Sequence, residues 1–404
     1  MSKVRNFSEI APNIAFPEFN FYELYHSTFE KSELGRIMKL LPLREMAENF
    51  GLVRKSMRPK LGRKSFFTPE GKVALMSLKM YTGLSCPKLL EQLNGNIHYQ
   101  IFCDVIIDPT RPLTNYKLLD DIMMELAGKL KIQQLQGILA DKWRSYMENL
   151  DTMYTDATCY ESEMRYPTDA KLLWEGIEKS YATMYELSSR LGIHRPRTKF
   201  LDVQKANLTY RKQRKHSRSQ TRKITRRLLD LLSKPHLRPI VRGKEVKSVE
   251  FGAKVNNILF DGISFIVKLS FNAFNEGSRL VHCLKMHKRL FGVEAKKVGG
   301  DTGYAGTENR DYCKANGIQT SFVKRGRPFG EKKKEKDLVR KELARVRATA
   351  MEGSFGTQKE HYDLRRVKAR TKRTEILYIF FGIHTANVVQ LADRIEQRAR
   401  LAAA

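Results

Sequence analysis

Apolar residues at helical spacing predict short helices near the start of the chain. Leu34, Ile37 and Leu40 recur at intervals of three, which places their side chains on one face of a helix. Thr68 and Pro69 then form a helix start, because Thr is a good N-cap and Pro fits the first helical position. The pattern therefore predicts a helix over residues 69–81.

A glycine turn separates this helix from a second one over residues 85–95. Two short helices joined at Gly83 are typical of a helix-turn-helix that reads DNA, and equally of a plain hairpin in an all-helical domain. Helical spacing returns over residues 114–149, where Gly128 and Gly137 predict a bend or two helices in place of one long rod. We predict an arm with short helices over residues 1–67 and a helical DNA-binding domain over residues 68–149.

Beyond residue 150 the pattern changes to strands alternating with helices. Residues 153–159 are rich in aromatic and β-branched side chains and predict a strand, in which Tyr154, Asp156 and Thr158 share one face. Asp261-Gly262 lies between two alternating runs and predicts a hairpin. The other expected elements are strands at 294–304 and 318–324, helices at 278–290 and 308–316, a linker at 325–337, and helix from 338 onward with breaks near Gly353 and at 369–373. This order predicts an α/β core over residues 150–404, a mixed sheet with helices on its faces, and an insertion at about 176–245.

Composition adds a strong positive charge. The 404-residue chain has 74 Lys and Arg against 44 Asp and Glu, a net charge of +30. Such an excess favours a polyanionic partner, either nucleic acid or an acidic membrane surface. The longest apolar run, residues 376–383, is too short to span a bilayer, and the first residues lack an apolar signal segment. We therefore expect a cytoplasmic protein that binds nucleic acid and does not enter a membrane.

Basic residues concentrate in particular segments. Between residues 205 and 227 there are ten Lys or Arg and no acid. Such a run is often a solvated helical face, but uncompensated like charges repel one another and phosphate contact relieves that repulsion. We predict DNA contact here and in a second run beginning at residue 365. The residues singled out are Arg211, Lys212, Arg214, Lys215, Arg218, Arg222, Lys223, Arg365, Arg366 and Lys368.

The five cysteines are scattered, odd in number and without a CxxC pair, which fits a reducing compartment and no zinc ribbon. Cys283 and His287 lie four residues apart and would share a helical face, as metal ligands can. Since no second ligand pair with matching spacing exists, we predict a structural role for both.

Three acids lie where an uncharged residue would fit better. Asp156 is inside a predicted strand, Asp301 ends a strand between glycines, and Glu352 lies on a predicted helix. Converging carboxylates suit Mg²⁺ or Mn²⁺, and two such ions about 4 Å apart can hold both oxygens of a phosphodiester displacement. Spacing alone leaves the alternative of helix caps or surface salt bridges open, because some triad can always be drawn among 44 acids.

Four segments in order resemble the ribonuclease-H-like catalytic domain of bacterial insertion-sequence DDE transposases. They are YTDATCYES with RYPTDAKLL (154–162 and 165–173), RGKEVKSVEFGAK (242–254), GDTGY (300–304) and EGSFGTQKEHYDLRRVKART (352–371). The stretch YTGLSCPKLLEQL is similar to the helical region before that domain. The resemblance implies that Asp156, Asp301 and Glu352 are catalytic and hold two Mg²⁺ ions, for which Mn²⁺ can substitute. It also implies cleavage at terminal inverted repeats, transfer of the 3′-hydroxyl to target DNA, and a homodimer that pairs two ends.

The last motif departs from the family pattern. Many relatives have Tyr and Arg seven and four residues before the Glu, where this chain has Arg345 and Ala348, and Arg347 is one residue from the expected Arg. The Lys seven residues after the Glu is kept as Lys359, which shares a helical face with Glu352 and is expected to contact phosphate. Two other functions remain open: a catalytically silent DNA-binding regulator derived from a transposase, and a metal-dependent nuclease without strand transfer.

Overall fold

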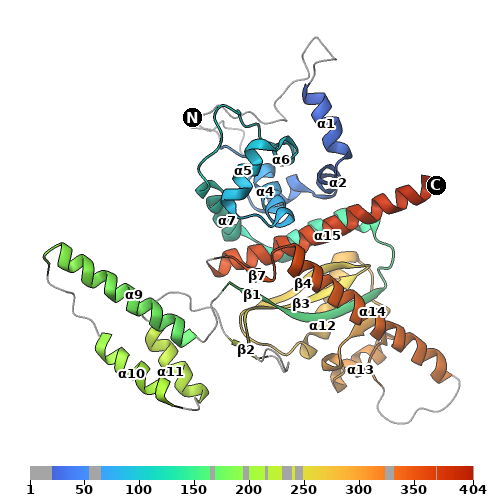
Figure 1. The fold of residues 1–404 in the computed structure, drawn as a ribbon. Helices are drawn as coiled ribbons and strands as arrows, with labels where there is room; N and C mark the ends of the chain where they lie inside the picture. Colours follow the sequence, from blue (N-terminus) through green and yellow to red (C-terminus); the bar gives the residue numbers. More distant parts are fainter. Residues whose placement is uncertain are drawn as a thin grey trace. The chain divides into compact units, whose positions relative to one another are not determined.

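The computed structural model describes residues 21–53, 65–163, 169–193, 200–213, 217–229, 239–241, 249–323, 332–369 and 371–403 (Figure 1). The chain forms two compact units. Unit 1 comprises Met1–Ser162 and Pro239–Ala404, and unit 2 comprises Glu163–Arg238. Unit 2 overlaps the insertion expected at about 176–245 and begins earlier, at Glu163.

The first part of unit 1 is helical. Its elements are α1 (Phe21–Lys31), α2 (Glu33–Leu40), α3 (Leu43–Asn49), α4 (Pro69–Thr82), α5 (Cys86–Gly95), α6 (Ile97–Phe102), α7 (Lys117–Lys129), α8 (Ile132–Trp143) and the 3-10 helix η3 (Arg144–Tyr146). The start of α4 is as predicted, since the Thr68 hydroxyl accepts a hydrogen bond from the Gly71 amide at 3.0 Å. Gly83 ends α4 in the left-handed conformation, with φ of 61°.

The prediction of a bend or two helices over residues 114–149 is confirmed. The chain breaks between α7 and α8, just after Gly128, whereas Gly137 lies inside α8. The side chains around Gly137 explain its helical state, because Gln136, Leu139 and Ala140 are all buried and hold α8 in the core. Tertiary packing here outweighs the low helix propensity of glycine.

The N-terminal helices share a core with the sheet. Trp143 is fully buried, and its indole nitrogen donates to the Leu40 carbonyl at 2.9 Å. The last helix, α15 (Lys372–Ala403), packs against α2, α4 and α7 as well as strand β4. The structure therefore places residues 68–149 in the same compact unit as the sheet and not in a unit of their own.

The sheet contains strands β1 (Thr152–Ser162), β2 (Pro239–Val241), β3 (Val249–Phe260), β4 (Ile263–Ser270), β5 (Lys297–Gly300), β6 (Gln319–Thr320) and β7 (Arg366–Val367). β3 pairs antiparallel with β2, β4 and β1, while β5 pairs parallel with β1 and β6. The expected hairpin is confirmed: Asp261 and Gly262 join β3 to β4 with φ of 43° and 81°. β7 adds two residues beside the end of β1.

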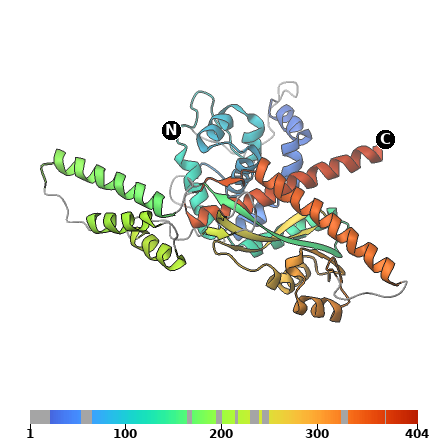
Figure 2. The ribbon, with the colours of Figure 1, turned by 60° about the horizontal axis from the view of Figure 1, so that its bottom comes forward.

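Helices cover both faces of this sheet (Figures 1 and 2). On one face α14 (Lys332–His361) packs Met351 and Phe355 against Leu259 and Tyr154. On the other, α12 (Leu280–Phe291) brings Cys283 to Thr155, the neighbour of Tyr154 on β1. The remaining elements are the 3-10 helices η4 (Gly277–Arg279) and η5 (Thr302–Tyr304) and helix α13 (Thr307–Ala315). A mixed α/β core is thus confirmed.

The last part of the chain differs from expectation at one position. α14 continues through Gly353 without a break, so the break predicted there is wrong, because buried Met351 and Phe355 hold the helix on the sheet on either side of the glycine. The second break is confirmed, since α14 ends at His361 and α15 begins at Lys372. Part of the linker expected at 325–337 is helical, because α14 already begins at Lys332.

Unit 2 is built from α9 (Asp169–Arg190), α10 (Phe200–Lys212) and α11 (Arg218–Leu229) (Figure 1). Its small core consists of Ala170, Trp174, Ile177, Val203, Ile224 and Leu228. The rings of Tyr181 and Phe200 stack at 3.9 Å beside it. Arg214 and Lys215 lie outside the described residues, as does the side chain of Arg218.

Candidate active site

Two of the three predicted acids meet where the end of β5 lies beside the middle of β1. β1 and β5 run parallel, and Thr155 is paired with Gly300, so Asp156 and Asp301 follow directly at the next register position. Asp156 lies on the face of β1 that α14 covers, as the alternation predicts. Its side chain is 16% exposed and that of Asp301 is 44% exposed. The pair therefore lies at the border between the core and solvent.

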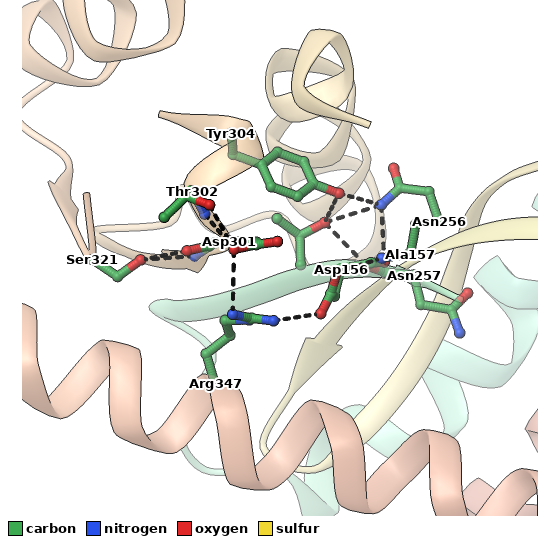
Figure 3. A network of polar contacts seen from close by, with 11 residues as sticks. Asp156, Ala157, Asn256, Asn257, Asp301, Thr302, Tyr304, Ser321 and Arg347 are labelled. Atoms are coloured by element: carbon green, nitrogen blue, oxygen red, sulfur yellow. Dashed lines mark hydrogen bonds and ion pairs between the residues drawn. The ribbon is translucent and has the colours of Figure 1, made fainter. Parts of the chain in front are cut away.

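Side-chain bonds fix the end of β5 before Asp301. The Ser321 hydroxyl accepts from the Gly300 amide at 2.9 Å and donates to the Gly300 carbonyl at 2.8 Å. One oxygen of Asp301, Oδ1, in turn accepts from the hydroxyl of Thr302 at 3.1 Å and from the Thr302 amide (Figure 3). The carboxylate is thus held on a short rigid turn and not on a long loop.

Two glycines close to Asp301 differ in the space around their Cα atoms. A Cβ on Gly299 would lie 2.4 Å from the ring of Tyr154, so only glycine lets β5 pack beside that ring. Gly303 has nothing within 4 Å of the Cβ position, so the turn after Asp301 is open on that side. Gly299 is therefore required by packing, whereas Gly303 leaves space beside Asp301.

A buried polar network supports Asp156 from the opposite side of the strand (Figure 3). The amide nitrogen of Asn256 lies 3.1 Å from the Asp156 carbonyl and 2.8 Å from the Tyr304 hydroxyl. That hydroxyl also lies 3.4 Å from the hydroxyl of Thr155. Burial raises the pKa of Tyr304, so its phenol stays protonated as a member of this network. The network ties β1 and β3 to the turn that carries Asp301.

Arg347 from α14 joins the two carboxylates. Its Nη2 lies 2.6 Å from Oδ2 of Asp156, and its Nη1 lies 3.8 Å from Oδ1 of Asp301 (Figure 3). The sequence marked this residue only as one position away from an expected Arg. Its partners lie too far away in the chain for spacing to reveal them, since Asp156 is 191 residues earlier.

The residues present fit a divalent cation in part. Asp156 and Asp301 supply the hard oxygen ligands that Mg²⁺ and Mn²⁺ prefer, and the guanidinium between them shows that this space accommodates positive charge. Among the described residues, however, no three His, Cys, Asp or Glu side chains gather closely enough to hold a metal ion. Glu352 is exposed on α14 and is not brought into such a group.

The helix face of Glu352 nevertheless borders the same strand. Lys359, two turns later on that face, has its Nζ 6.0 Å from the ring centroid of Tyr160. Tyr160 is four residues after Asp156 on β1 and therefore points to the same side of the sheet. Lys359 therefore borders β1, whereas Glu352 shares its helix face by spacing and is exposed.

The other predicted DNA contacts lie on the surface. Among the described side chains, Arg211, Lys212, Arg222 and Lys223 in unit 2 are exposed, as are Arg365, Arg366 and Lys368 in unit 1. Two of these have acidic neighbours, because Arg365 lies 3.2 Å from Glu360 and Lys368 lies 3.0 Å from Asp363. The helix α5, by contrast, exposes Lys88 beside Glu91, which favours a plain hairpin over a DNA-reading helix.

Cys283 and His287 are engaged in the core. The thiol of Cys283 lies 3.4 Å from the Asn256 side-chain oxygen, and Nε2 of His287 lies 2.7 Å from the Leu150 carbonyl. Burial raises the pKa of Cys283 to about 12 and lowers the pKa of His287. A neutral, protonated thiol is a poor metal ligand, which agrees with the structural role predicted for the pair.

The helix α15 has the length and composition of a possible membrane span. α15 is long and apolar enough to cross a bilayer by length and composition, but 89% of its most apolar 18-residue window is buried inside the protein. Such burial is typical of the core helix of a folded unit, and α15 has that position beside β4 and α4.

Comparison with known proteins gives one family. The comparison with curated proteins and the comparison with solved structures found no match. The model of the transposase DDE domain matches residues 298–389, a segment that contains Asp301, Arg347 and Glu352. Members of that family act on DNA and use divalent metal ions. Residues 298–389 are therefore similar to the transposase DDE domain, which supports a DDE transposase.

Proposed function

We propose that the protein is a transposase that cuts DNA at transposon ends and transfers the freed 3′-hydroxyl to target DNA. Asp156 and Asp301 on adjacent parallel strands are the observation that carries this proposal, because they lie together although 145 residues separate them in the chain (301 − 156). Glu352, which is exposed on α14, would be the third acid. The mixed sheet with helices on both faces supports a ribonuclease-H-like core.

The chain's own groups divide the work. Asp156, Asp301 and Glu352 would hold two Mg²⁺ ions, or Mn²⁺ in their place, and the bound ions would activate water or the 3′-hydroxyl and stabilise the leaving oxygen. Asp156 is fixed by the Asn256 network and Asp301 by its turn, so neither has to be ordered when DNA arrives. Lys359 on the Glu352 face would place an ammonium against a phosphate of the bound strand.

DNA would be positioned by basic surfaces outside the site. α11 in unit 2 buries Ile224 and Leu228 and exposes Arg222, Lys223, Arg226 and Arg227. Basic residues on the exposed side of a helix suit phosphate contacts that do not depend on sequence. We assign the recognition of terminal repeats to no single helix, because the α4–α5 pair exposes too little positive charge. Two ends would be paired in a homodimer.

The experiment replaces each acid by its amide. Asp156→Asn, Asp301→Asn and Glu352→Gln are expected to reduce cleavage of a labelled transposon end by at least about 10³-fold, since each removes a metal ligand. Retardation of the same DNA in a gel should be unchanged. Asp311→Asn, at an exposed position on α13 in the same domain, is the matched control and should cleave normally.

Product analysis separates the alternatives. A target plasmid and Mg²⁺ are included with the wild-type protein and the labelled end. Joined product supports a transposase, cut product alone indicates a nuclease, and retardation alone indicates a DNA-binding regulator. Normal cleavage by any one of the three amide variants would remove that residue from the catalytic set.

A further inference from the structure

Arg347 occupies the space between the two carboxylates that the proposed function assigns to metal. We propose that Arg347 is a displaceable counter-ion, which neutralises Asp156 and Asp301 in the metal-free protein and competes with divalent cations for them. This inference rests on the proposed metal site. It adds a residue that sets how readily that site takes up metal.

The competition follows from which oxygens are engaged. On Asp156, Oδ1 accepts from the Ala157 amide at 2.8 Å and Oδ2 accepts from Arg347 at 2.6 Å, so both oxygens are occupied. On Asp301, Oδ1 is shared between Thr302 and the guanidinium of Arg347. Mg²⁺ binds oxygen at about 2.1 Å with near-ideal octahedral geometry, and a guanidinium at 2.6 Å from Oδ2 of Asp156 places a positive charge where the ion would approach. Metal and Arg347 therefore compete for Asp156.

Electrostatics explains why a cation is needed there at all. Asp156 and Arg347 are mostly buried, with 16% and 18% of their side chains exposed. Two carboxylates side by side at the edge of the core repel each other, and this repulsion is stronger than in water because the surroundings are less polar. One guanidinium offsets part of that repulsion. A divalent cation offsets more of it and therefore has a driving force to replace the guanidinium.

The guanidinium of Arg347 makes few hydrogen bonds, so a competing cation can displace it. Its Nε is buried without a hydrogen-bond partner, and the 3.8 Å from Nη1 to Asp301 is too long for a hydrogen bond. Arg394 provides the contrast within this chain. Its Nη1 and Nη2 donate at 2.6 Å each to the side chain and the carbonyl of Asp261, which fixes the β3–β4 turn to α15. Arg394 has the two-pronged geometry of a structural pair, and Arg347 does not.

The test measures metal binding directly, by titrating the full-length protein with MnCl₂ in a calorimeter. Arg347→Met removes the competing charge and is expected to tighten Mn²⁺ binding by about tenfold or more, a change of roughly 1.4 kcal/mol. Arg347→Lys keeps the positive charge but loses the planar pair of guanidinium donors, so its affinity for Mn²⁺ is expected to lie between those of the wild type and Arg347→Met. Arg345→Met, an exposed position on the same helix, is the matched control and should bind Mn²⁺ as the wild type does.

Thermal unfolding gives a second reading that a merely structural arginine would not produce. In EDTA, Arg347→Met should melt below the wild type because the two carboxylates are left without their cation. Saturating Mn²⁺ should raise its melting temperature by more than it raises that of the wild type. If Arg347→Met destabilises the protein too far for calorimetry, Arg347→Lys carries both measurements.

Each outcome has a distinct meaning. Tighter Mn²⁺ binding by Arg347→Met with unchanged Arg345→Met supports the counter-ion. Equal or weaker binding by Arg347→Met, while the wild type binds Mn²⁺, overturns it and leaves the proposed metal site intact. Absence of Mn²⁺ binding by the wild type and by both Arg347 variants overturns the metal site itself, and the counter-ion with it.

Discussion

His384 is a titratable residue sealed inside the core of unit 1. It is 3% exposed on α15, lies 4.5 Å from Phe380 between ring centroids, and is close to Trp143 and Phe265. Desolvation lowers its pKa from the ordinary 6.5 to about 3. In the folded protein the imidazole therefore stays neutral at pH values where the unfolded chain already binds a proton.

This difference makes the free energy of unfolding depend on pH. Stability is full above pH 6.5 and falls as the pH drops towards 3, by roughly 1 kcal/mol per pH unit, because protonation then favours the unfolded chain. His384→Gln should flatten that decline between about pH 6.5 and pH 5 while keeping an acceptor for the Asn387 amide, which lies 3.2 Å from the imidazole Nδ1. Urea unfolding at several pH values checks this. An equally steep decline in the variant would assign the pH dependence to other groups, of which His287 is the first to test.

At the same scale, the visibility of site residues in the sequence depends on how local their signal is. Asp156 interrupts an alternating strand and Asp301 lies between glycines, so both are marked by their neighbours. The sequence around Asn256 and Arg347 gives no such indication, because the roles of these two residues depend on bonds to Asp156, which lies 100 and 191 residues away in the chain. Such partners follow only from the strand order, which no local pattern specifies.

Among the elements, β4 shows how the sheet is closed at one edge. Among the described strands, β4 pairs only with β3, so the outward backbone groups of Ser264 and Ile266 face no described strand. Gln136 from α8 donates to the Ile266 carbonyl at 3.0 Å and accepts from the Ile266 amide at 2.6 Å. Asn387 from α15 does the same for Ser264 at 2.7 and 3.0 Å. Two side-chain amides thus replace the missing strand and prevent pairing with another chain.

Gln136→Met should therefore be strongly destabilising although it preserves the volume. It leaves a buried amide and a buried carbonyl of Ile266 unsatisfied, at about 1–3 kcal/mol each. Urea unfolding would measure the loss, and hydrogen exchange at the Ile266 amide would report the local opening. Gln92→Met, at an exposed position on α5, is the control and should stay within about 0.5 kcal/mol of the wild type. A comparable loss in both variants would contradict the role of Gln136.

Helix starts and turns that depend on adjacent residues were predictable from the sequence. Helix continuity that depends on burial against other elements was not. The Thr68 cap with Pro69 and the Asp261-Gly262 turn carry their own geometry, and the structure has both where the sequence places them. Gly353 suggested a break by propensity, but it lies inside α14 between buried Met351 and Phe355. Gly137 likewise lies inside α8 beside buried residues. The two-residue strands β6 and β7 are too short to show an alternation at all.

For the whole molecule, the net charge of +30 is distributed over two units whose basic residues differ in how far nearby acids compensate them. The hydrophobic core of the described part of unit 2 has six buried residues, and most of the other described side chains of that unit are exposed or half-buried. Its described exposed residues include basic groups on both α10 and α11, whereas the basic run of unit 1 is partly compensated by Glu360 and Asp363. Uncompensated charge binds phosphate with a greater release of counterions than charge already engaged in an ion pair. Unit 2 is therefore expected to supply more of the salt-dependent affinity for DNA.

The salt dependence of DNA binding tests this arrangement. Replacing Arg222 and Lys223 together by Ala should make the negative slope of log K against log salt less steep. Its magnitude should fall by about 0.9 for each phosphate that the variant no longer binds, hence by about 1.8 if each side chain binds one. Fluorescence anisotropy of a labelled duplex between about 50 and 200 mM KCl measures that slope. Arg190→Ala is the matched control in the same unit, because Arg190 is exposed but paired with Glu186 at 2.7 Å. Its slope should change by less than half as much, since a guanidinium already paired with a carboxylate displaces fewer counterions from DNA. Equal slopes for the double variant and the wild type would move the DNA surface away from α11 and leave the basic run after residue 365 as the next segment to replace.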